Sequence, residues 1–406
     1  MGKIKKIKKA NNFMYALLRA IFRPYLFFRY GLKFDRSVSA KVKRPCIIVS
    51  NHAVFHDQFI VGLGFKFGIN FVASDSLFRV GRFRRWILET LVRPIPIAKG
   101  SSDPGAVKDI MSVIRQGGAV ALFPEGNRTF FGATGYFKPT IGKLVKKLGV
   151  PLVVVNIRGG YNTDPRWRHN NVSRGKMTAS VTRVVSPEEL NELSGDEIND
   201  LIAREIDFNE FEYNAEKKIV FKGKRKAEHL ETALFVCPQC GKWHDLHSRG
   251  NEFYCSSCGA RVKINGLGFF EKVENANAVP DTILECSKIQ LDAVKNRDYS
   301  AFSDKPVFSD ANVKIYSCER AKRQKLLGKG DIALYSDRIT AGEFAFPIER
   351  ISDMAIQSIR KIQIYMHDGS MYMIEAPEHT NILKYMVCGY HLRHLIKGEE
   401  DEYFGY

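Results

Sequence analysis

The sequence predicts an α/β catalytic domain with a mostly parallel sheet and flanking helices, followed by a small cysteine-rich ribbon and a small β-barrel. Three observations favour this fold class: short aliphatic runs in the first half, two Cys-x2-Cys pairs in the middle, and alternating apolar segments near the end. A length of 406 residues allows two or three domains of about 150 residues each. Hydrophobic residues make up 45% of the chain, which excludes a wholly disordered or collagenous protein.

The first 50 residues are strongly basic. They carry thirteen Lys and Arg against Asp35 alone, so +12 of the formal net charge of +18 lies in the first eighth of the chain. Bases and Pro24 interrupt the apolar residues here, so no window offers the ~18 uncharged apolar residues of a spanning helix. No small-residue cleavage site follows a short apolar core, so no secretory signal is expected. We expect residues 1–44 to form a basic amphipathic segment on an anionic membrane surface, in preference to a helix packed on the protein.

Five short apolar runs predict the strands of one α/β domain over residues 45–215. Near-continuous aliphatic runs are typical of strands buried on both faces of a sheet. The runs cover residues 46–50, 95–97, 119–123, 150–155 and 179–185. Ser186 and Ser194 are each followed three residues later by Glu, which predicts capping boxes that begin two short helices at the end of this domain.

Four of the eight cysteines form two Cys-x2-Cys pairs separated by fourteen residues, close to the spacing of a four-thiolate zinc site. These cysteines are Cys237, Cys240, Cys255 and Cys258. Gly241 and Gly259 follow the pairs and let the backbone turn around the ligands. The alternative, two disulfides, requires an oxidising compartment, which the missing secretory signal disfavours. We predict a zinc ribbon over residues 230–265, with a structural zinc because four cysteines leave no open coordination position. No redox cofactor is expected.

The C-terminal third has the pattern of antiparallel strands between two helices. A helix is predicted over residues 282–296 and another over 381–396, ending at Gly398. Strand-like segments cover residues 331–335, 339–346, 351–356, 361–366 and 371–375, and His367-Asp-Gly369 is a hairpin signal between the last two. Several antiparallel strands capped by one helix predict a β-barrel of the pleckstrin-homology-like (PH-like) kind for residues 275–400.

Candidate catalytic residues directly follow two of the predicted strands. His52 and Asp57 come after the strand ending at Ser50, and Glu125, Gly126 and Arg128 come after the strand ending at Phe123. Ligands bind at such strand ends in open α/β sheets.

With Asp57 accepting a hydrogen bond from one ring nitrogen of His52, the other nitrogen becomes a base for a substrate hydroxyl. No G-x-S-x-G motif supplies a nucleophile, so attack by the substrate's own hydroxyl on an acyl donor is favoured. A structural His52 and a local Glu125–Arg128 ion pair are the alternatives. His56, next to Asp57, is expected to be a bystander or to support the pair.

Together these motifs resemble the glycerolipid acyltransferase family, which includes the 1-acylglycerol-3-phosphate acyltransferases. Residues 51–57 match its N-H-x4-D motif, and residues 123–128 match F-P-E-G-[ST]-R with Asn in place of Thr or Ser, with His52 and Glu125 73 positions apart. The segment 94–99 is similar to the second motif, although Lys99 stands where arginine is more common. The segment 150–155 is similar to the fourth, although Asn156 stands where a proline is usual. The resemblance covers roughly residues 15–205.

The resemblance implies an O-acyltransferase. Together with the basic segment and the missing targeting signal, we expect it at the cytoplasmic face of the cell membrane, peripheral or monotopic. His52 is then the general base and Asp57 orients it. Arg128, with Lys99, holds a phosphate, Gly126 permits close approach of the backbone, and Glu125 orients the substrate or the arginine.

The implied partners are acyl-CoA or acyl-carrier protein as donor and a lysophospholipid as acceptor, foremost 1-acylglycerol 3-phosphate, giving phosphatidic acid. Glycerol 3-phosphate or another lysolipid remains an alternative acceptor. An alternative of another class is a non-catalytic zinc-ribbon protein that binds nucleic acid or protein. The excess of positive charge lies far from the ribbon in the sequence, so we do not expect a nucleic-acid partner.

Overall fold

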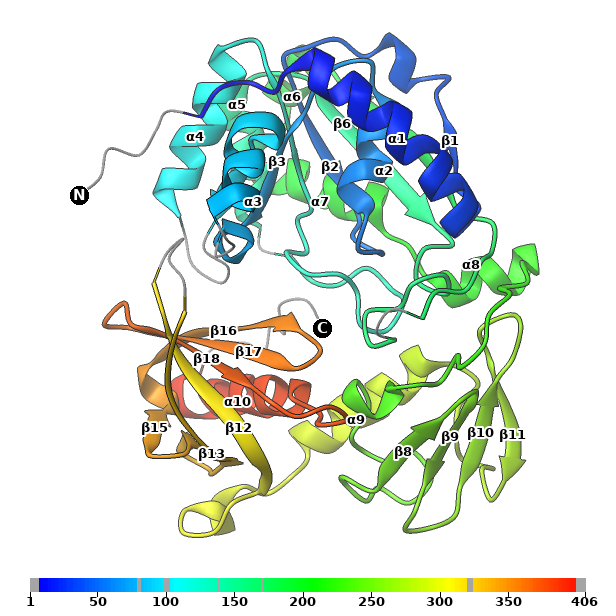
Figure 1. Ribbon diagram of the computed structural model, residues 1–406, viewed down its shortest axis with the longest axis vertical. Coiled ribbons are helices and arrows are strands. Elements are labelled where there is room, and N and C mark those ends of the chain that lie inside the picture. The colour runs from blue at the N-terminus through cyan, green and yellow to red at the C-terminus, as the bar shows by residue number, and fades with distance from the viewer. Residues whose placement is uncertain are drawn as a thin grey trace. The chain divides into compact units, whose positions relative to one another are not determined.

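The structure, a computed structural model, describes residues 7–78, 82–97, 103–137, 139–168, 171–319 and 324–398 (Figure 1). The chain divides into two compact units. Of the described residues, unit 1 comprises those within 7–165 and 172–222, and unit 2 comprises 166–168, 171 and those within 223–398. The proposed active site belongs to unit 1, and the cysteine pairs belong to unit 2.

Unit 1 is built on a seven-stranded sheet in the order β1-β7-β6-β2-β5-β3-β4. Neighbouring strands run parallel, except for the antiparallel pair β6 and β7. The strands are β1 (Lys33–Asp35), β2 (Cys46–Ser50), β3 (Asn70–Ser74), β4 (Ile95–Ile97), β5 (Ala119–Leu122), β6 (Leu152–Arg158) and β7 (Thr178–Val185). The predicted mostly parallel α/β sheet is therefore confirmed.

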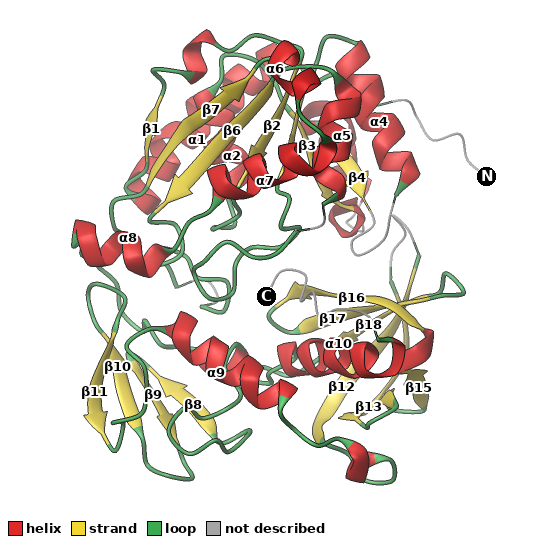
Figure 2. Ribbon diagram, turned by 180° about the vertical axis from the view of Figure 1, so that it is seen from behind, coloured by secondary structure: helices red, strands yellow, loops and turns green. Residues whose placement is uncertain are grey.

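Helices lie on both faces of this sheet (Figure 2). Ile48 of β2 packs into one hydrophobic core with residues of α1 and α2, whereas its neighbours Ile47 and Val49 pack into a second core with residues of α4, α5, α6 and α7. The helices are α1 (Asn12–Tyr30), α2 (Asp57–Gly64), α3 (Arg82–Ile87), α4 (Pro104–Arg115), α5 (Thr140–Leu148), α6 (Pro187–Glu192), α7 (Gly195–Ile206) and α8 (Glu210–Lys217), with short turns η1 (Ser39–Lys41), η2 (Asp75–Phe78) and η3 (Leu88–Val92). Alternating burial into two cores explains the continuous aliphatic runs of the sequence.

The two predicted helix starts near the end of unit 1 are present. The Ser186 side chain accepts from the Glu189 backbone N–H at the start of α6. At α7 the box is complete, since the Ser194 hydroxyl accepts from the Glu197 backbone N–H and the Glu197 carboxylate accepts from the Ser194 backbone N–H.

Helix α1 has one buried and one exposed apolar face. Tyr15, Leu26 and Tyr30 are buried in the first core. At 3.6 residues per turn, a second group of apolar residues falls within an arc of about 80°. These residues are Phe13, Leu17, Ile21, Pro24 and Phe28, and all are exposed. None of the helices in the described part of the chain is long and apolar enough to cross a bilayer.

Unit 2 contains two antiparallel sheets. The smaller has the order β11-β10-β9-β8, and the larger has the order β15-β14-β13-β12-β18-β17-β16. Their strands are β8 (Leu246–Arg249), β9 (Glu252–Cys255), β10 (Arg261–Ile264), β11 (Phe270–Glu274), β12 (Phe308–Cys318), β13 (Lys325–Leu334), β14 (Arg338–Ala341), β15 (Phe344–Pro347), β16 (Ile351–Ser358), β17 (Lys361–Met366) and β18 (Met371–Glu375). The described part of unit 2 also contains the helices α9 (Ile283–Lys295) and α10 (Leu383–Lys397) and the turns η4 (Leu230–Thr232), η5 (Ser300–Phe302) and η6 (Ile348–Arg350).

In the larger sheet, β12 and β18, the first and last of its strands along the chain, pair with each other. Helix α10 follows β18. A set of antiparallel strands followed by one helix agrees with the barrel-like domain predicted from the sequence. The PH-like assignment and the proposed domain boundaries remain predictions.

Candidate functional site

The site begins where β2 ends, and Asn51 fixes that end. The Asn51 side-chain oxygen accepts from the Ile157 backbone N–H, and its amide donates to the Ile157 carbonyl, both at 2.8 Å. The buried side chain thereby extends the pairing between β2 and β6 by one residue. His52 therefore follows directly after a residue that is hydrogen-bonded to the sheet.

His52 and Asp57 meet as their spacing predicts. The His52 Nδ1 lies 2.7 Å from the Asp57 Oδ2, and the same oxygen accepts from the backbone N–H groups of Ala53 and Val54 at 2.6 and 2.9 Å. Asp57 is fully buried at the start of α2, while the His52 side chain is 20% exposed. A carboxylate held by two backbone donors is a fixed partner for the ring, and the ring reaches solvent.

The second motif holds the backbone of His52 from both sides. The Glu125 Oε1 accepts from the His52 backbone N–H at 2.7 Å, and the Thr129 backbone N–H donates to the His52 carbonyl at 2.9 Å. The His52 ring also stacks on the Phe123 ring, with centroids 4.3 Å apart. Residues 73 positions apart in the sequence therefore form one site, as expected from the two motifs.

Glu125 contacts backbone groups. Its other oxygen, Oε2, accepts from the Gly135 backbone N–H at 2.9 Å, so the carboxyl group bridges two loops. Burial raises the pKa of Glu125 to about 8. The two backbone donors act in the opposite direction and lower this pKa, whereas the nearby charge of Asp57 raises it further. The sequence did not indicate this bridge, since Gly135 has no motif of its own.

The remaining predicted residues lie on the turn after β5. Gly126 has a left-handed backbone (φ 67°), and its N–H donates to the Phe123 carbonyl at 3.0 Å. The half-buried Arg128 has its guanidinium carbon 6.0 Å from the ring centroid of Phe55. Lys99 lies outside the described residues.

A second histidine beside the pair is tied to distant residues that the sequence did not single out. The His56 Nδ1 lies 2.6 Å from the Tyr30 hydroxyl, which also bonds to the Asp164 Oδ2 at 3.0 Å. Tyr30 is the last residue of α1, and Asp164 follows β6. Burial is the main cause that lowers the pKa of His56, and the charge of Arg29 lowers it further. His56 is thus held one residue before Asp57 by a hydrogen-bonded chain.

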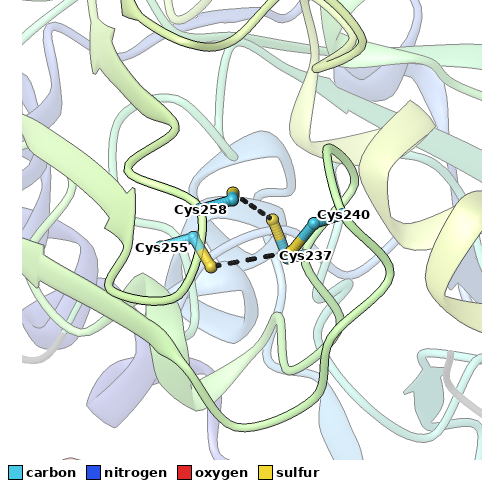
Figure 3. Close-up of side chains that lie close together, drawn as sticks. All are labelled: Cys237, Cys240, Cys255 and Cys258. Carbon is cyan, nitrogen blue, oxygen red and sulfur yellow. Dashed lines mark hydrogen bonds between the residues drawn. The ribbon is translucent and has the colours of Figure 1, made fainter.

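In unit 2 the four predicted cysteine ligands come together (Figure 3). The Cys237 and Cys258 sulfurs are 3.8 Å apart, and the Cys240 and Cys255 sulfurs are 4.0 Å apart. A tetrahedral zinc with Zn–S bonds of about 2.3 Å places its sulfurs about 3.8 Å from one another. The four free thiols therefore fit a tetrahedral metal ion.

The two cysteine turns have the same hydrogen bonds. Gly241 donates to the Cys237 carbonyl at 2.8 Å, and Gly259 donates to the Cys255 carbonyl at 3.0 Å. Both glycines have left-handed φ, 70° and 72°. Glycine adopts this conformation without strain, as expected from the sequence.

Comparison with known proteins agrees with the motifs. The acyltransferase family model matches residues 32–158, which include β1 to β6 and both halves of the site. A chloroplastic 1-acyl-sn-glycerol-3-phosphate acyltransferase of Brassica napus, BAT2, is 26% identical over 143 residues, or 35% of this chain and 41% of its own length. LPAT1 of Arabidopsis thaliana, with the same description, is 25% identical over 143 residues, or 35% of this chain and 39% of its own length. The chain thus spans about two fifths of the length of these curated relatives.

A solved structure, the 1-acyl-sn-glycerophosphate acyltransferase PlsC from Thermotoga maritima, aligns with a TM-score of 0.39 at 20% identity. The alignment covers 47% of this chain and 78% of that chain.

Proposed function

We propose that this chain, which matches the acyltransferase family model over residues 32–158, transfers an acyl group to the hydroxyl of a lysophospholipid. The proposed acceptor is 1-acylglycerol 3-phosphate, the product is phosphatidic acid, and the donor is acyl-CoA or acyl-carrier protein. One observation carries the proposal: the His52–Asp57 pair is held by the Glu125–Thr129 segment through the backbone of His52 itself.

The geometry favours His52 as a general base. Because Nδ1–H donates to the Asp57 carboxylate, the lone pair of the ring is on Nε2. Nε2 takes the proton of the acceptor hydroxyl while the hydroxyl oxygen bonds to the thioester carbonyl carbon. When the carbon–sulfur bond breaks, the imidazolium returns the proton to the leaving thiolate. Asp57 stabilises the imidazolium between these two steps.

The turn after β5 is the proposed phosphate site. The Arg128 guanidinium offers paired donors to phosphate oxygens, and the absence of a side chain at Gly126 leaves room for the backbone to approach the substrate. Lys99 is a second proposed cation. We assign Glu125 as a positioning residue, because both of its oxygens bind backbone N–H groups of the site.

A lipid acceptor requires a membrane surface, and α1 offers a face for it. Phe13 and Phe28 are 76% and 69% exposed on the apolar stripe described above. Phe55, in the His52 loop, is 63% exposed. Its ring and that of Tyr25 on α1 both contact the His56 ring, with centroids 5.0 and 5.5 Å away. Exposed aromatic groups thus adjoin the catalytic loop, and we propose peripheral binding at the cytoplasmic face of an anionic membrane.

We also propose that the four-cysteine cluster of unit 2 holds a structural zinc and that this region is a zinc ribbon. The fit of the sulfur distances to a tetrahedral ion supports this assignment. Four thiolate ligands leave no position for a substrate, so no catalytic step is assigned to the metal.

The test is acyl transfer by the purified chain on anionic vesicles with labelled acyl-CoA and 1-acylglycerol 3-phosphate. We expect label in phosphatidic acid, lost in His52→Ala and kept in His247→Ala, which changes an exposed histidine of β8. Unchanged turnover in His52→Ala rejects the assigned base. Glycerol 3-phosphate and other lysolipids serve as competing acceptors, and no transfer to any of them rejects the proposed function.

A further inference from the structure

Two histidines and a glutamate of unit 2, none of them a residue of either proposed site, converge. His229 precedes η4, and Glu378 and His379 lie between β18 and α10, about 150 positions later in the sequence. One potential ligand atom from each of the three residues lies within 4.8 Å of the others. We propose that these residues form a second zinc site, separate from the four-cysteine cluster.

The geometry of the three side chains is close to that of a zinc site. The His229 Nε2 lies 3.9 Å from the Glu378 Oε1, and the two imidazole rings stack with centroids 4.8 Å apart. Ligand atoms about 2.0–2.1 Å from a tetrahedral zinc are about 3.4 Å from one another. Glu378 and His379 have side chains 62% and 55% exposed, so small rotations close this difference without moving the core.

A buried carboxylate orients one of the histidines. The Glu231 Oε1 lies 2.6 Å from the His379 Nδ1, so the His379 Nε2 is the nitrogen left for the metal. Zinc-bound histidines commonly donate their other ring N–H to a carboxylate in this way. The Glu231 side chain is only 8% exposed, which distinguishes it from a surface ion-pair partner.

The same carboxylate is connected to the other histidine. The Ser248 hydroxyl donates to the Glu231 Oε2 and accepts from the His229 backbone N–H at 2.8 Å. Asn381 donates from its side chain to the Glu231 carbonyl at 2.8 Å. Both histidine-bearing segments are therefore fixed to one buried group before any metal binds.

The proposed site has an open position. Two nitrogens and one carboxylate oxygen leave the fourth tetrahedral position to water. Two of the three ligand side chains are exposed, so we expect zinc to exchange here more readily than at the four thiolates. His229 precedes the strands of the smaller sheet, whereas Glu378 and His379 follow β18 of the larger sheet. A metal bound to all three residues would therefore link the two sheets of unit 2.

Zinc titration of the full chain, stripped of metal, tests the proposal. We expect two equivalents in the wild type and one in the double variant His229→Gln, His379→Gln. His367→Gln, which changes an exposed histidine in the β17–β18 turn, should keep two. Glu231→Gln should weaken the second equivalent about 10- to 100-fold, because it acts on His379 and not on the metal.

Substitution with Co²⁺ shows which site is filled. Thiolate ligands give a charge-transfer band that nitrogen and oxygen ligands lack, so the first equivalent should produce this band and the second should not. The band must persist in the double variant, which shows that the ribbon still folds. Saturation of the wild type at one equivalent overturns the proposal, and so does a second equivalent that persists in the double variant.

Discussion

Replacing Asp57 by Asn tests the catalytic assignment most directly. The amide keeps the shape of the side chain and can still accept from the Ala53 and Val54 N–H groups, but it removes the negative charge beside the His52 ring. With Nδ1 and Oδ2 2.7 Å apart, the centres of the two charges are about 4 Å apart. At an effective dielectric constant of about 20, the attraction between imidazolium and carboxylate is about 4 kcal/mol.

The loss should therefore appear in kcat and not in KM. About 4 kcal/mol corresponds to a decrease of roughly 10³-fold in kcat, at 1.36 kcal/mol per factor of ten. Asp57 is fully buried, so it is not placed to contact the acceptor, and KM should change little. The assay is initial-rate acyl transfer on anionic vesicles with both substrates varied.

A control variant and a stability measurement distinguish a catalytic effect of Asp57→Asn from loss of folding. Asp35→Asn changes an exposed aspartate at the end of β1 and should have wild-type kinetics. Thermal unfolding of the Asp57 variant shows whether the buried amide has destabilised unit 1. If kcat of the folded variant stays within tenfold of the wild type, the carboxylate does not stabilise a catalytic imidazolium and the assignment fails.

Three further predictions concern stability, metal and membrane. Burial raises the pKa of Glu125 to about 8, well above its unfolded value, so its contribution to stability is complete below about pH 4 and is lost as pH rises through about 8. The unfolding temperature should fall between about pH 4 and about pH 8. Glu125→Gln should flatten this slope in part, since burial also raises the pKa of Glu210 to about 7, and an unchanged slope contradicts the prediction. Cys240→Ser should lose one zinc equivalent by metal analysis, whereas a wild type without zinc refutes the ribbon. Phe13→Ser and Phe28→Ser should each weaken co-sedimentation with anionic vesicles about tenfold, because a buried Phe contributes about 1.5–3 kcal/mol, and equal binding would exclude this face.

Strands that coincide with short apolar runs were predictable from the sequence. The runs at β2 and β4, and those at β17 and β18, match the strands residue for residue, because buried aliphatic runs and a hairpin turn leave few alternatives. Strand β3 was missed because it begins with Asn70. This buried side chain accepts from the Ala10 N–H and donates to the Lys8 and Arg93 carbonyls, and these contacts exist only in the folded chain.

Irregular strands were predicted less well. Strand β12 was missed because a shift in its register between Asp310 and Val313 breaks the alternation of apolar and polar residues. The segment 339–346 was predicted as one strand but forms parts of two, β14 and β15, which turn at Gly342 with φ 52°. One glycine within an apolar run, Gly342, was not enough to predict this turn from the sequence.

The candidate site, like the strands, was predictable from the sequence only in part. His52 and Asp57 are five positions apart, so a short turn brings them together and the spacing indicates the pair. The bond from Glu125 to the His52 backbone depends instead on the parallel pairing of β2 with β5, which places the two following loops side by side. A main-chain donor carries no sequence signal, so the contacts that support a positioning role for Glu125 are visible only in the folded protein.

Tyr30 connects the helix that carries the proposed membrane face, α1, to His56, which precedes Asp57 of the proposed catalytic pair. The sequence favoured a separate segment on the membrane over packing on the protein, but α1 presents an exposed stripe on one side and buried Tyr15, Leu26 and Tyr30 on the other. Through its hydroxyl, Tyr30 holds His56, the residue that precedes Asp57 and the start of α2. The proposed lipid contact and the support of the His56 ring therefore involve the same helix, and a chain lacking α1 would lose the Tyr30–His56 bond along with the proposed membrane surface.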